Sequence, residues 1–143
     1  MYKSAKLHKK IAFVVYKVAL REFVMVYQDM NNTSEKLEDA ILSFTLGEVD
    51  KAHMLLQELV KVNPNCIDSW RALAEVCLAR NELNSAEDAC RKALEIDGDD
   101  LTIVVSLARI LVQKGDKDGA EKASSKARLL GWKEELAQKN DEE

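Results

Sequence analysis

The sequence predicts an all-α protein in which a solenoid of helix–turn–helix repeats follows an N-terminal amphipathic helix. The first observation is a series of alanines at 34-residue intervals, at Ala52, Ala86 and Ala120. Thirty-four residues is the length of one helix–turn–helix unit, which covers its apolar face only when the next unit stacks on it. The second observation is that the 143 residues include only one Pro and five Gly, so little interrupts the helical periodicity.

Two more series keep the same interval. A second alanine series runs twelve residues upstream, at Ala40, Ala74 and Ala108. We expect both alanine series at close helix crossings, because a larger side chain would separate the backbones. Between the two series lie Gly47, Asn81 and Gly115, which are residue types that accept the left-handed backbone of a turn between helices.

These positions resemble the tetratricopeptide repeat family, whose pattern is aromatic, Leu, Gly/Ala, aromatic, Gly, Ala, aromatic, Ala and Pro at fixed offsets. The middle unit matches best, at Trp70, Leu73, Ala74, Cys77, Asn81, Ala86, Cys90, Ala93 and Gly98. The third unit matches without aromatics, at Val104, Leu107, Ala108, Leu111, Gly115, Ala120, Ser124 and Ala127. The family's proline is found at Pro64. The resemblance implies a right-handed α-solenoid with repeats at 33–66, 67–100 and 101–134.

The first unit and the C-terminal end depart from a simple repetition. Leu37, Ile41 and Phe44 fall one place late when counted from Gly47, which predicts a first helix shortened by one residue. Asn32, followed three residues later by Glu35, predicts a helix start. Residues 135–143 are polar and acidic, and we expect them to be a frayed helix end. We expect Trp132 to cover the last repeat.

The N-terminal segment, residues 1–32, differs in charge from the rest of the chain. Six basic and two acidic residues give residues 1–30 a net charge of +4, which leaves −8 for the remainder of a chain whose total is −4. A basic arm and an acidic body can attract each other, or the arm can bind an anionic partner.

The same segment predicts an amphipathic helix with an unusually broad apolar surface. We expect the helix to make its interface with Phe13, Tyr16, Leu20, Phe23 and Tyr27. Four covers are compatible with this surface: the repeats themselves, a second copy of the chain in a homodimer, a membrane surface, or a bilayer interior. A spanning helix is the least favoured, because charged residues interrupt the apolar run, and a membrane surface is less favoured than the first two.

The sequence offers no recognisable catalytic, cofactor or metal motif. His8 and His53 lack a His or Cys at i+4, and both Gly-rich phosphate loops and nucleophile elbows are missing. The cysteines, Cys66, Cys77 and Cys90, are odd in number and without C-x-x-C spacing, so we expect reduced core residues. No signal-peptide pattern is evident, which favours a cytoplasmic protein. The acidic repeats lack the basic stripe of a nucleic-acid-binding surface.

The resemblance implies a concave groove lined by the first helix of each repeat. The groove residues in the second and third repeats are Arg71, Glu75, Leu78, Val105, Arg109 and Val112. Such a groove could hold a protein segment through apolar anchors while the arginines fix carboxylates, or its charges could neutralise each other across neighbouring helices. The family's carboxylate clamp for chaperone tails is not matched, because its positions hold Ala72, Thr102 and Ser106.

Three functions are consistent with these observations. The leading hypothesis is a non-enzymatic adaptor or scaffold that binds a protein or peptide of unknown identity in the groove. The first alternative is a secretion-type chaperone, because the family with that role, like this chain, combines three such repeats, an acidic body and a dimerising N-terminal helix. The second alternative is a membrane-peripheral assembly factor attached through its N-terminal helix.

Overall fold

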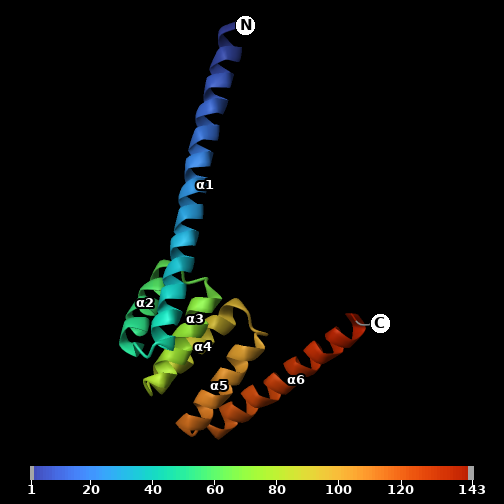
Figure 1. The fold of residues 1–143 in the computed structure, drawn as a ribbon. Helices are drawn as coiled ribbons and strands as arrows, with labels where there is room; N and C mark the ends of the chain where they lie inside the picture. Colours follow the sequence, from blue (N-terminus) through green and yellow to red (C-terminus); the bar gives the residue numbers. More distant parts are fainter. Residues whose placement is uncertain (1, 142–143) are drawn as a thin grey trace. The chain divides into compact units, whose positions relative to one another are not determined.

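The computed structural model describes residues 2–141, which form helices without any strand (Figure 1). The helices are α1 (Tyr2–Thr45), α2 (Val49–Val62), α3 (Ile67–Ala79), α4 (Leu83–Ile96), α5 (Leu101–Lys114) and α6 (Lys117–Asp141). The chain divides into two units, residues 1–36 and 37–143. Within residues 2–141, no helix combines the length and the apolar character needed to cross a bilayer. The predicted all-α repeat fold is confirmed.

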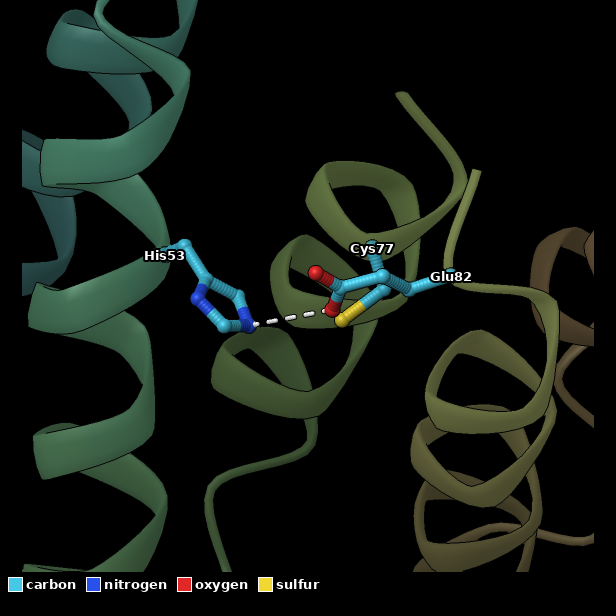
Figure 2. Close-up of side chains that lie close together, drawn as sticks. All are labelled: His53, Cys77 and Glu82. Atoms are coloured by element: carbon cyan, nitrogen blue, oxygen red, sulfur yellow. Dashed lines mark ion pairs between the residues drawn. The ribbon is translucent and has the colours of Figure 1, made fainter. Parts of the chain in front are cut away.

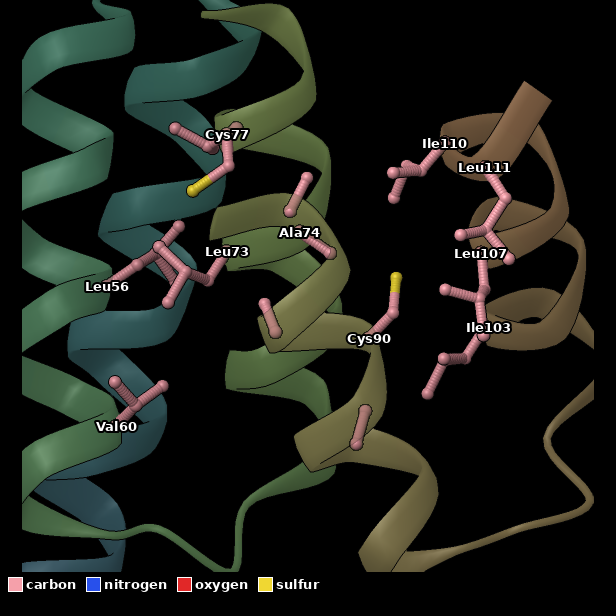
Figure 3. Close-up of a cluster of buried hydrophobic side chains, with 14 of the residues drawn as sticks. Leu56, Val60, Leu73, Ala74, Cys77, Cys90, Ile103, Leu107, Ile110 and Leu111 are labelled. Atoms are coloured by element: carbon pink, nitrogen blue, oxygen red, sulfur yellow. The ribbon is translucent and has the colours of Figure 1, made fainter. Parts of the chain in front are cut away.

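In the second unit, successive helices pack side by side: α2 on α3, α3 on α4, α4 on α5 and α5 on α6. Both predicted alanine series lie buried in this stack, at Ala40, Ala52, Ala74, Ala86, Ala108 and Ala120. Larger side chains fill the space between the crossings, among them the fully buried Leu56, Ile103 and Ile110 (Figure 3). The small residues therefore set the close helix approach, and the branched residues complete the core.

The three turns between paired helices share one geometry. Gly47, Asn81 and Gly115 have φ angles of 83°, 59° and 79°, as the sequence predicted for these positions. The residue after each turn donates a backbone hydrogen bond across it, from Glu48 to Ser43, from Glu82 to Cys77 and from Asp116 to Leu111, at 2.9, 2.9 and 3.0 Å. The donors and the acceptors are each spaced by 34 residues, so the three repeats are in register.

This register shows that the predicted one-residue shortening of the first repeat is wrong. Leu37, Ile41 and Phe44 are not the equivalents of the core residues Leu73 and Cys77. The equivalent of Cys77 is Ser43, which is buried with 3% of its surface exposed. The apolar stripe of the first repeat is therefore rotated by one residue around α1, and the helix is not shortened.

Two predicted boundaries also differ from the structure. The helix start expected at Asn32 is not there, because α1 runs unbroken through it, and Thr33 Oγ1 donates to the Asp29 carbonyl oxygen inside the helix at 2.8 Å. At the other end, α6 is one helix as far as Asp141. Trp132 does not cover the last repeat, since it is 69% exposed, whereas Leu130 is buried.

Candidate functional site

The first helices of the three repeats present equivalent residues on one side, which we call the inner face. Because the repeats are in register at 34-residue spacing, its positions form three columns. The columns are Leu37, Arg71 and Val105; Ile41, Glu75 and Arg109; and Phe44, Leu78 and Val112. The inner face is therefore apolar in the first repeat and carries charge in the second and third.

A cavity of about 370 Å³ lies at the apolar end of the inner face. Its lining residues come from the end of α1, from α2 and from α3: Leu37, Ala40, Ile41, Phe44, Leu56, Asp68, Arg71, Ala72, Glu75 and Val76. Seven of these ten side chains are apolar, and the three charged ones all lie on α3. Such a cavity suits an apolar side chain whose neighbours along a chain are polar.

The charged residues next to this cavity pair across the repeats. Arg109 Nη2 donates to Glu75 Oε1 and Oε2 at 2.9 and 2.8 Å, and Ser106 Oγ donates to Glu75 Oε1 at 2.8 Å. Arg71 Nη1 donates to Asp68 Oδ1 at 2.6 Å, and its Nη2 pairs with Asp100. Both inner-face arginines thus already have carboxylate partners, and the neutralising arrangement foreseen from the sequence forms between Glu75 and Arg109.

The structure distributes the sequence-predicted groove residues unevenly. Arg71 and Glu75 line the cavity, and Leu78 is half-buried against the core. Arg109 pairs with Glu75 but does not line the cavity, and Val105 and Val112 are 51% and 65% exposed on α5.

Sequence reasoning missed the contribution of the first repeat to the site. Leu37, Ile41 and Phe44 line the cavity, whereas the sequence pattern predicts only that they mark a helix shortened by one residue. Their offset of 34 residues from Arg71, Glu75 and Leu78 was the signal that could have identified them.

A second group of polar side chains meets where α2, α3 and α4 come together (Figure 2). His53 Nε2 lies 3.7 Å from Glu82 Oε2, and Cys77 Sγ is beside them, with all three potential ligand atoms within 4.8 Å of one another. Spacing along one helix cannot indicate a group whose members come from three separate parts of the chain.

The buried thiols are protonated at neutral pH. Burial, followed by the charge of Glu82, raises the pKa of Cys77 to about 11. Burial, followed by the charge of Glu75, raises the pKa of Cys90 to about 12. Nucleophilic chemistry needs the thiolate, so neither cysteine is prepared for catalysis. The prediction that Cys77 and Cys90 are core residues is confirmed, whereas Cys66 is half-buried.

The N-terminal part of α1, considered by itself, carries a row of large exposed side chains. The predicted interface residues Phe13, Tyr16, Leu20, Phe23 and Tyr27 are 60%, 63%, 43%, 70% and 58% exposed. Their spacing alternates between three and four residues, which places them in one stripe along the helix. On the same helix, Lys17 Nζ lies 4.8 Å from the centroid of the Phe13 ring, which is a cation–π contact.

Helix pairs stacked in register, with small residues at each crossing and a left-handed residue at each turn, define an α-helical repeat protein. Residues 43–100 match the model of the tetratricopeptide repeat family. This part of the chain therefore consists of tetratricopeptide repeats, and over these residues the resemblance drawn from the sequence is confirmed.

Solved structures with the same fold include proteins of different roles. The type III secretion translocator chaperone SycD of Yersinia enterocolitica, in complex with a peptide of the translocator YopD, aligns with a TM-score of 0.68 and 18% identity over 76% of this chain and 86% of the other. A T3SS complex from Aeromonas hydrophila aligns with a TM-score of 0.70 and 23% identity over 76% of this chain and 73% of the other.

A third similar structure is the second TPR of Spaghetti (RPAP3) bound to an HSP90 peptide. It aligns with a TM-score of 0.66 and 15% identity over 68% of this chain and 91% of the other. At these identities the likeness establishes the fold. A search of curated protein sequences found no match.

Proposed function

We propose that the protein is a non-enzymatic adaptor that binds a segment of another protein on its inner face. The observation that carries the proposal is the cavity formed by Leu37, Ile41 and Phe44 together with α2 and α3. An apolar side chain of the partner would enter this cavity, and polar groups of the partner would lie along the Glu75–Arg109 pair. Similar folds that bind a YopD peptide or an HSP90 peptide support this use of the repeats.

The chemistry of the site supports binding rather than catalysis. The cavity is mostly apolar, its charged groups already pair with one another, and the buried thiols are protonated. Binding energy at such a surface comes from a few buried apolar anchors, while paired charges around them mainly set specificity.

A displayed library of random peptides tests the proposal without knowledge of the natural partner. We expect selected peptides to share an apolar anchor and to bind the Ile41→Glu variant at least tenfold more weakly, because a carboxylate in the cavity opposes that anchor. Ile41 is 47% exposed, so the variant should fold. Met54→Glu on α2 is the matched control, since Met54 is 61% exposed and lies outside the cavity lining. Peptides that bind both variants equally well would contradict the proposal.

The second candidate is a secretion-type chaperone that self-associates through its N-terminal helix. The alternating three- and four-residue spacing of Phe13, Tyr16, Leu20, Phe23 and Tyr27 favours it, because that spacing produces a seam suited to pairing with another helix. The similarity of the repeats to SycD gives independent support for this class.

Light scattering of the full chain tests this second candidate. A dimer that becomes a monomer when Leu20 and Phe23 are both changed to Glu would support pairing through the seam. The matched control changes Val15 and Val18 to Glu, which adds the same charge to the same stretch but off the seam, and it should stay dimeric. A monomeric wild-type chain would exclude pairing, and salt-sensitive binding to anionic vesicles would then indicate membrane attachment.

A further inference from the structure

We propose that His53, Cys77 and Glu82 form a binding site for a single Zn²⁺ ion that joins the first repeat to the second. The three residues come from α2, from α3 and from the residue that precedes α4. The proposal is independent of what binds on the inner face.

The separations between the side chains suit a tetrahedral ion. Zn–N, Zn–O and Zn–S bonds of about 2.0–2.3 Å place tetrahedral ligand atoms roughly 3.3–3.6 Å apart. His53 Nε2 and Glu82 Oε2 are already 3.7 Å apart, and all three ligand atoms lie within 4.8 Å of one another. The three side chains point towards one another (Figure 2), and metal binding would require the sulfur to approach the other two ligand atoms by up to roughly 1.5 Å.

The surrounding structure holds two of the ligands in place. The Glu82 backbone N–H donates to the Cys77 carbonyl oxygen at 2.9 Å, so the turn at the left-handed Asn81 fixes the two ligands relative to each other. Arg80 Nε donates to Glu82 Oε1 at 2.8 Å, which leaves Oε2 directed towards His53. Outer hydrogen bonds of this kind orient metal-binding carboxylates.

The ligand set fits zinc, and the site can be reached from the surface. An imidazole nitrogen, a sulfur and a carboxylate oxygen are the three ligand types that Zn²⁺ takes in proteins, and water would fill the fourth position. His53 and Cys77 also line a surface cavity of about 460 Å³ through which an ion can enter. On binding, the Cys77 thiol becomes a thiolate and its proton passes to solvent.

The next repeat junction shows that the fold alone does not create this group. The residues 34 positions further along, at the same places in the following pair of repeats, are Glu87, Leu111 and Asp116. Leu111 has no ligand atom, and Glu87 accepts hydrogen bonds from Lys114 and Arg91. A nitrogen, a sulfur and an oxygen therefore meet at only one of two equivalent junctions in the described chain.

The test uses the full chain, reduced and freed of metal, with Zn²⁺ and with Co²⁺ as a spectroscopic substitute. We expect one metal ion per chain, a thiolate-to-cobalt absorption band, and a rise in Tm on addition of Zn²⁺. Cys77→Ser should abolish the band, and His53→Gln and Glu82→Gln should each weaken Zn²⁺ binding at least tenfold. Cys90→Ser is the matched control, because Cys90 is as deeply buried as Cys77 and is not in the group.

Specific results would overturn the proposal. The first is a wild-type chain that shows no thiolate-to-cobalt band. The second is a band that persists in Cys77→Ser but disappears in Cys66→Ser, which would place the metal at the half-buried thiol instead. His53 and Glu82 are only partly buried, so their variants keep the test valid even if Cys77→Ser does not fold.

Discussion

The first repeat and the two that follow it use the same backbone positions for different chemistry. Ile41, Glu75 and Arg109 are equivalent in the helix–turn–helix unit, yet the first lines an apolar cavity and the other two form an ion pair. The difference shows that the repeat fixes where a side chain is presented, whereas each repeat selects independently what is presented. One end of the inner face is therefore apolar, and the rest carries paired charges.

The largest expected effect comes from the third column of the inner face. Phe44→Ala should lower the free energy of unfolding by about 2 kcal/mol, since a half-buried ring packed against the core is lost. The equivalent change Val112→Ala should stay within about 0.5 kcal/mol, because Val112 is 65% exposed. Urea unfolding of both variants measures the contrast, and equal losses would show that the two ends of the face are built alike.

The second prediction concerns the ion pair that replaces the apolar contact. Removing the Glu75–Arg109 interaction should cost about 0.5–1 kcal/mol, because both side chains are partly exposed and solvent screens them. A double-mutant cycle with Glu75→Gln and Arg109→Gln measures the coupling, which should fall further in high salt. A coupling that salt leaves unchanged would show that the Ser106 hydrogen bond, rather than charge, dominates.

A smaller effect is expected in the pH dependence of a second link between the same repeats. Hydrogen bonds from Lys114 and then Arg91 lower the pKa of Glu87 below its usual value of 4.5. The folded state thus favours the carboxylate, so its stabilising contribution is present above pH 4.5 and is lost as pH falls below that value. Glu87→Gln should reduce this acid loss, measured by urea unfolding at several pH values, and Glu95→Gln, at an exposed pair with Lys92, should not.

The smallest expected effect is at the far end of the repeats. Trp132→Ala should change the free energy of unfolding by less than about 0.5 kcal/mol, because the ring is 69% exposed. Leu130→Ala is the matched control and should cost more than the tryptophan change, since Leu130 is buried there. A large loss of unfolding free energy in the Trp132 variant would show that the indole does cover the last repeat, as the sequence predicted.

Repetition explains what the sequence could predict about the fold. The buried alanines and the left-handed turn residues recur at a fixed interval, so each supports the interpretation of the others. The prediction of a shortened helix from Leu37, Ile41 and Phe44 is wrong because the hydrophobic pattern alone does not distinguish a core stripe from the adjacent, cavity-lining stripe one residue away on the helix. The register became clear only from the backbone hydrogen bonds across the turns.

The sites were less predictable because they combine separate elements. The cavity needs α1, α2 and α3 together, and the group of His53, Cys77 and Glu82 needs three segments that no local spacing rule connects. The pairing of Arg71 with Asp100 was likewise not predictable, since Asp100 lies at the start of α5, on a different element, where it competes with any external carboxylate. Sequence patterns along one helix contain no information about contacts between side chains of separate elements.

The two tryptophans of the chain have contrasting environments, and this gives the protein a built-in optical probe. Trp70 is half-buried and its indole N–H donates to the Pro64 carbonyl oxygen at 2.8 Å, whereas Trp132 is open to water. Emission from Trp70 should shift to longer wavelength when the junction between the first two repeats opens, while emission from Trp132 should stay nearly constant. In a Trp132→Phe background, fluorescence would therefore follow that single junction in real time, without any attached dye.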